Sequence, residues 1–109
     1  MSLKLTEKTA QIAADKKVGN FVTLFEDDRT RITHWVIAPG EQTGWHLHDY
    51  DYVSIQQSIG TLHLKNANGN EKTIAYVPGT ARMHRAPVEH NATNIGNVDI
   101  RVLEIEYKR

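Results

Sequence analysis

The stretch that decides the fold covers residues 40–60 and reads GEQTGWHLHDYDYVSIQQSIG. A glycine stands at each end, and the second half, from Tyr52 to Ile59, alternates polar and apolar side chains over most of its length, as a half-buried strand does. His46 and His48 are two residues apart, and residues with this spacing point to the same face of an extended strand. Two imidazoles that project in parallel can bind one metal ion. The stretch therefore predicts β-strands that carry a candidate metal site.

The chain on both sides of this stretch also reads as short strands separated by turn residues. Segment 66–70 is an Asn-rich turn, in which Asn68-Gly69 supplies the positive φ that a tight hairpin requires. Many short strands with Gly, Pro and Asn between them predict an all-β sandwich or jelly-roll barrel for residues 19–109. Residues 1–18 are expected to form an N-terminal arm or a short helix. The predicted strands are residues 21–25, 31–38, 52–59, 61–65, 72–77, 81–85 and 98–107.

The composition narrows the class of protein. The 109 residues carry 13 Lys and Arg against 13 Asp and Glu, so the formal net charge is zero. Nucleic acids and anionic membranes select for basic proteins, so neither is expected as a partner. No apolar run approaches the roughly 18 residues of a membrane span, and no apolar signal core follows Met1. The lack of cysteine excludes disulfides and thiolate ligands. We expect a single-domain cytoplasmic protein.

The histidine pair and its flanking glycines resemble the first motif of the cupin superfamily, G-x5-H-x-H-x3-4-E-x6-G. The chain supplies the glycine and histidine positions of this motif at Gly40, His46, His48 and Gly60. The glutamate, which is the usual fourth protein ligand in cupins, is absent. Its position holds Tyr52 when counted from His48 and Val53 when counted back from Gly60. Valine cannot bind a metal, and a neutral phenol with a pKa of about 10 binds one only when it is strongly activated.

A second resemblance to cupins lies nearer the C-terminus. His90-x3-Asn94 is similar to the end of the second cupin motif, G-x5-P-x-G-x2-H-x3-N, but the P-x-G part falls at Arg85-Ala86-Pro87 and lacks the glycine. The resemblance covers residues 28–107 and implies a double-stranded β-helix, the RmlC-like jelly-roll barrel. The residues in and around the motifs resemble those of small bacterial cupins assigned to β-alanine degradation. The segments that carry this resemblance are residues 38–46, 51–53, 88–91 and 103–106.

The resemblance implies a metal site formed by His46, His48 and His90. Three protein ligands with open positions are the layout of a catalytic metal rather than a structural one. Imidazole nitrogen binds Fe, Mn, Ni, Cu and Zn, so the ligand set predicts one divalent transition metal without naming it. Three-histidine cupins that lack the glutamate include the iron-dependent thiol dioxygenases.

Further residues are candidates for the pocket around the metal. Tyr52, Ser54 and Gln56 share one strand face and are expected to face the cavity, where they would bind a small polar ligand. Gln56 is also a candidate oxygen ligand. Arg82 and Arg85 either bind a substrate carboxylate or belong to a solvated strand face.

Other polar side chains have structural alternatives. His84 is expected to be a pocket-rim or packing residue rather than a ligand. Glu104 and Glu106 share one face of the last strand, where such residues line the barrel or pair with arginines. Asn94 is expected to support its turn or to orient His90.

Three functions remain open from the sequence. The first is a metal-dependent enzyme that acts on a small polar or carboxylic metabolite by oxidation or isomerisation; the resemblance implies β-alanine or related acid catabolism. The second is a non-enzymatic cupin that binds or senses a small molecule at a degenerate metal site. The third is an interaction scaffold. Single-domain cupins commonly pair, so a homodimer is expected.

Overall fold

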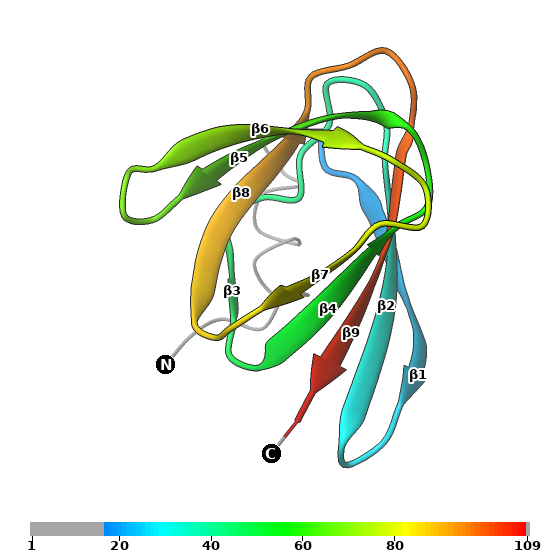
Figure 1. The fold of residues 1–109 in the computed structure, drawn as a ribbon, viewed down its shortest axis with the longest axis vertical. Coiled ribbons are helices and arrows are strands. Elements are labelled where there is room, and N and C mark those ends of the chain that lie inside the picture. Colours follow the sequence, from blue (N-terminus) through cyan, green and yellow to red (C-terminus); the bar gives the residue numbers. More distant parts are fainter. Residues whose placement is uncertain (1–16, 109) are drawn as a thin grey trace.

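The computed structural model describes residues 17–108, which form nine strands in two antiparallel sheets (Figure 1). These residues contain no helix, so the all-β prediction is confirmed. The described residues therefore also contain no helix that is long and apolar enough to cross a membrane. The predicted N-terminal arm, residues 1–18, lies outside the described residues except for its last two. The strands are β1 (Asn20–Glu26), β2 (Thr30–Ile37), β3 (His46–His48), β4 (Asp51–Gln56), β5 (Gly60–Asn66), β6 (Glu71–Tyr76), β7 (Ala81–His84), β8 (Val88–Asn94) and β9 (Ile100–Tyr107).

The two sheets face each other and enclose the interior of a barrel (Figure 1). One sheet has the strand order β1-β2-β9-β4-β7, and the other has the order β3-β8-β5-β6. The chain crosses between the sheets repeatedly, which is the topology of a jelly roll. β6 and β7 are terminal strands of different sheets and do not pair with each other. The barrel therefore has a side where two strand edges meet without a hydrogen-bond ladder.

The apolar core fills one end of the barrel. Alternation along β2 turns Thr33, Trp35 and Ile37 inward, and all three are buried. Trp35 packs against Phe21 of β1 with ring centroids 4.8 Å apart. The rest of the buried apolar cluster comes from both sheets: Leu62, Leu64, Tyr76, Ala92, Ile100 and Val102. The polar end of the interior is left for the histidines.

Several strand boundaries differ from those predicted. β8 was not predicted as a strand, because its inward residues are His90, Ala92 and Asn94, which give no apolar alternation. β4 ends at Gln56 rather than at Ile59, whose side chain is 63% exposed in the following turn. β9 begins at Ile100, two residues later than predicted.

Asn94 ties the end of β8 to the neighbouring turns. Its Nδ2 donates to the carbonyl oxygens of Ile37 (2.8 Å) and Val98 (2.7 Å), and its Oδ1 accepts from the Gly96 N–H at 2.9 Å. All three contacts go to the backbone, so Asn94 supports the turn and does not orient His90. Its buried amide also fixes where β8 ends, and thus the position of the third histidine.

Candidate metal centre

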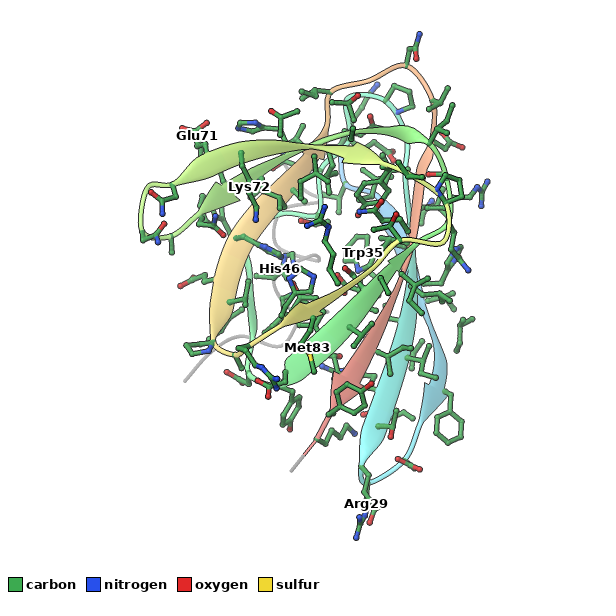
Figure 2. The ribbon with its side chains drawn as sticks, viewed as in Figure 1. Arg29, Trp35, His46, Glu71, Lys72 and Met83 are labelled. Carbon is green, nitrogen blue, oxygen red and sulfur yellow. The ribbon has the colours of Figure 1, made fainter. Side chains whose placement is uncertain are left out.

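Three histidines converge inside the barrel. His46 and His48 come from β3, and His90 comes from β8, directly opposite His46 in the antiparallel register. The Nε2 atom of His46 lies 3.0 Å from that of His48 and 3.1 Å from that of His90. All three side chains are buried, and their ligand atoms lie within 4.8 Å of one another. Figure 2 shows His46 in the space between the two sheets.

The other ring nitrogen of two of these histidines is held by an acceptor. His46 Nδ1 lies 2.8 Å from the Gly44 carbonyl oxygen, and His48 Nδ1 lies 3.6 Å from Glu106 Oε2. A carbonyl or carboxylate oxygen only accepts, so the proton of each neutral ring is on Nδ1, and Nε2 carries the lone pair. Two lone pairs 3.0 Å apart cannot hydrogen-bond to each other, whereas a cation between them satisfies both. The donor set therefore fits a divalent transition metal.

The third histidine is also held in its metal-binding form. Burial is the main cause that lowers the pKa of His90 to about 3, and the neighbouring imidazoles of His48 and His84 act in the same direction. His90 is therefore neutral at neutral pH, and only the neutral ring can bind a metal.

A carboxylate that the motifs did not predict lies behind His48. Glu106 of β9 accepts hydrogen bonds from Arg31 Nε at 2.5 Å and from Arg31 Nη2 at 3.1 Å. Burial opposes the ionisation of Glu106, but His48 and Arg31 outweigh it and lower its pKa to about 2. This carboxylate contacts the candidate ligand His48 on the side of Nδ1, away from the Nε2 atom that faces His46. A carboxylate in this position orients a ligating imidazole and raises its basicity.

Tyr52, at the position of the missing glutamate, packs against His48. Its ring stacks on His48 with centroids 4.2 Å apart and, on its other face, on His84 with centroids 4.4 Å apart. Burial raises the pKa of Tyr52 well above the ordinary value of a phenol. The residue is therefore a neutral ring that restricts the orientation of His48.

A cavity of about 50 Å³ adjoins the histidines, and His46 and His90 form part of its wall. At 10–15 Å³ for each water, this volume holds roughly three to five water molecules. Tyr52, Ser54 and Gln56 line it, as the alternation along β4 predicts. Gln56 Oε1 accepts a hydrogen bond from the Val77 N–H at 2.8 Å and so holds the chain after β6.

The wall formed by β4 and β7 is polar. Ser54 Oγ and His84 Nε2 lie 2.8 Å apart and form a hydrogen bond. Burial lowers the pKa of His84 to about 4, and nearby positive charges act in the same direction. His84 lines the cavity as a neutral ring, as expected for a rim residue.

Two polar groups on β2 and β9 complete this wall. Glu104 lines the cavity opposite Ser54 in the strand register, and burial raises its pKa. The buried Trp35 Nε1 lies near Glu104 and lowers its pKa slightly, but within residues 17–108 it has no partner with hydrogen-bond geometry.

The two arginines considered for carboxylate binding lie in different places. Arg82 lines the cavity. Arg85 is largely exposed and pairs with Asp51, with Nη1 and Oδ2 3.3 Å apart. Alternation along β7 and its end at His84 separate the two side chains.

Comparison with known proteins identifies the family. No protein-family model matches the chain. It is 38% identical over 77 residues to the beta-alanine degradation protein BauB of Pseudomonas aeruginosa, covering 71% of this chain and 80% of that protein. The chain belongs to the cupin superfamily. The identity to BauB also supports the resemblance to the β-alanine-degradation subgroup of cupins.

Solved structures agree with this assignment. A cupin domain from Bordetella pertussis superposes on this cupin with a TM-score of 0.81 at 29% identity, covering 87% of this chain and 98% of that one. An RmlC-like cupin from Methanocaldococcus jannaschii with a double-stranded β-helix fold gives a TM-score of 0.70 at 18% identity, covering 86% and 84% of the two chains. The predicted double-stranded β-helix is confirmed.

Proposed function

We propose that this cupin is a metal-dependent enzyme that acts on a small polar or carboxylic metabolite by oxidation or isomerisation. His46, His48 and His90 hold one divalent transition metal. The observation that carries the proposal is the convergence of three buried Nε2 atoms, two of them on rings whose Nδ1 faces an acceptor. A structural role for these rings does not require the Nε2 lone pairs of His46 and His48 to face each other at 3.0 Å.

The bound metal would supply a Lewis acid or an oxygen-binding centre. Three protein ligands leave coordination positions open, and the cavity provides the space beside them. The chain's own residues bind and orient the ligand: Ser54, His84 and Glu104 offer polar contacts on one wall, while Leu62 and Leu64 on the other exclude water. The cavity volume restricts the buried part of the substrate to a few non-hydrogen atoms.

We further propose that the substrate belongs to β-alanine catabolism or to the catabolism of a related acid. The support is the 38% identity to a protein named for beta-alanine degradation, over 80% of its length. A small acid or aldehyde is also of the size that the cavity admits.

Elemental analysis of protein purified without chelators tests the metal site. We expect about one equivalent of iron, manganese, nickel, copper or zinc per chain, and its loss in His46→Ala. His63→Ala is the matched control, because His63 bonds to the exposed Glu71 on the surface. If the purified protein holds no metal and takes up none on reconstitution, the enzyme proposal is wrong.

The alternative is a non-enzymatic cupin that binds or senses a small molecule. The observation that favours it is the stacked, neutral Tyr52 at the position of the usual glutamate ligand. Turnover of small acids and aldehydes, followed by NMR and by oxygen consumption, separates the two functions. Ligand binding that persists unchanged in His46→Ala, without turnover by the wild type, favours the alternative.

A further inference from the structure

Two cations stand on β6 and β7, the terminal strands of the two sheets. Lys72 of β6 is opposite Leu64 in the register, and Leu64 faces the interior. Arg82 of β7 is opposite Ser54, which also faces the interior. Directly opposed residues share a sheet face, so both cations are on the inner faces of their sheets. Both residues are exposed, and Arg82 lines the cavity. We call the solvent-exposed region on the inner faces of β6 and β7 the mouth.

The two charges act on the same group. Lys72 and Arg82 each lower the pKa of His84, which lines the cavity. Figure 2 shows Lys72 extending from β6 toward the interior of the barrel. The mouth therefore carries two positive charges, one from each sheet, above the metal-binding histidines.

Neither cation has an acidic partner among residues 17–108. Other cations in this range do: Arg31 pairs with Glu106, and Lys108 pairs with Glu26. An anion bound at the mouth would be attracted by both charges. An anionic ligand would also be drawn to the mouth from solution.

The interior of the cavity offers a further polar contact. Trp35 Nε1 is a buried donor beside the Glu104 carboxyl in the cavity wall, but its geometry does not meet that of a hydrogen bond within residues 17–108. An acceptor atom of a ligand or water in the cavity would provide one. A carboxylate at the mouth uses the two cations, and a second polar atom on the ligand would add a contact with this nitrogen. The cavity has room for only a few atoms between them.

We propose that Lys72 and Arg82 bind the carboxylate of a small organic acid at the mouth, with the rest of the acid inside the cavity. The inference rests on the proposed function in one respect, namely that this cavity is the ligand site. It assigns substrate recognition to a lysine and an arginine from opposite sheets, in place of the Arg82 and Arg85 pair suggested by the sequence.

Ligand-observed NMR titration of the purified protein tests the inference. The probes are acetate, propionate and butyrate, their uncharged primary amides, and inorganic phosphate. We expect the acids to bind and the amides to bind at least tenfold more weakly. Lys72→Gln and Arg82→Gln should each weaken acid binding about tenfold, the size expected when a charged hydrogen-bond partner is lost.

Arg85→Gln is the matched control, because it removes the same charge from the same end of the molecule but outside the cavity. It should bind the acids like the wild type. The inference is wrong if no acid binds, if the amides bind as well as the acids, if phosphate binds and the acids do not, or if the Lys72→Gln/Arg82→Gln double variant keeps wild-type affinity.

Metal content measured on the same samples separates this inference from the proposed function. Charge-dependent acid binding by protein that holds no metal supports the mouth and contradicts the metal proposal. A full equivalent of metal together with acid binding that ignores Lys72 and Arg82 contradicts the mouth and leaves the metal proposal standing.

Discussion

Replacing Glu106 by glutamine should weaken metal binding without removing any ligand. Glu106 is ionised at all pH values of interest, because its pKa is about 2, so the substitution removes a full negative charge beside His48. Gln can also turn its amide N–H toward His48 Nδ1 and thereby favour the wrong tautomer. Both effects make His48 a poorer ligand.

The size of the effect follows from the geometry. Loss of a group that orients a metal ligand typically costs 10- to 100-fold in affinity. The 3.6 Å between Glu106 Oε2 and His48 Nδ1 exceeds an ordinary hydrogen bond, so we expect the lower end of this range, about tenfold or about 1.4 kcal/mol. Arg31 also loses its partner, and breaking a buried pair costs up to about 3–5 kcal/mol. Because Arg31 is partly exposed, the loss of stability should be smaller than that.

Competition with a chromophoric zinc chelator measures the affinity, and circular dichroism confirms that each variant is folded under the same conditions. Glu71→Gln is the matched control, because Glu71 also contacts a histidine, the surface residue His63, at 2.8 Å. It should leave the affinity unchanged. A dissociation constant for Glu106→Gln within twofold of wild type would refute the argument that this carboxylate orients His48.

Two further predictions concern stability. Gly60 has φ +142°, and a Cβ there would collide with the Ile100 side chain, so Gly60→Ala should lower the free energy of unfolding by about 2 kcal/mol or more. Gly79 has φ +89°, but a Cβ there would enter open space, so Gly79→Ala should lower the free energy of unfolding by only about 1 kcal/mol. Equal losses for the two variants in urea unfolding would contradict the collision at Gly60. The pKa of His84 is about 4 in the folded state against about 6.5 unfolded, so the unfolded chain binds the extra proton between these values. The wild type should therefore lose stability as pH falls from about 6.5 toward 4, and metal-free His84→Gln should lose less; parallel urea-unfolding curves at pH 7 and pH 5 would show the idea to be wrong.

The sequence predicted the architecture because its signals are local. Alternation along β4 assigns Tyr52, Ser54 and Gln56 to one face, and the structure places them on the cavity wall. β8 escaped prediction because its inward residues are an imidazole, a methyl group and an amide. Such a strand is stabilised by polar contacts, such as those of Asn94, that a hydrophobic pattern does not reveal.

The site was predictable only in part for a related reason. The close grouping of His46, His48 and His90 could be predicted because these residues occupy motif positions that are recognisable in the sequence. The contact of Glu106 with Arg31 joins residues 75 positions apart and depends on the β2–β9 register, which no local pattern gives. The proposed shared role of Lys72 and Arg82 likewise depends on the strand order, which places them on the terminal strands of different sheets.

The shortness of β3 has a consequence for how the ion comes and goes. This strand has three residues, and within residues 17–108 it lies at the edge of its sheet and pairs only with β8, yet it carries two of the three proposed ligands. A metal bound by both His46 and His90 would cross-link β3 to β8 and restrain the separation of the two strands. Fraying of β3, rather than diffusion through the cavity, should then set the exchange rate of the ion. Amide hydrogens of residues 46–48 should be the ones whose exchange slows most on metal loading.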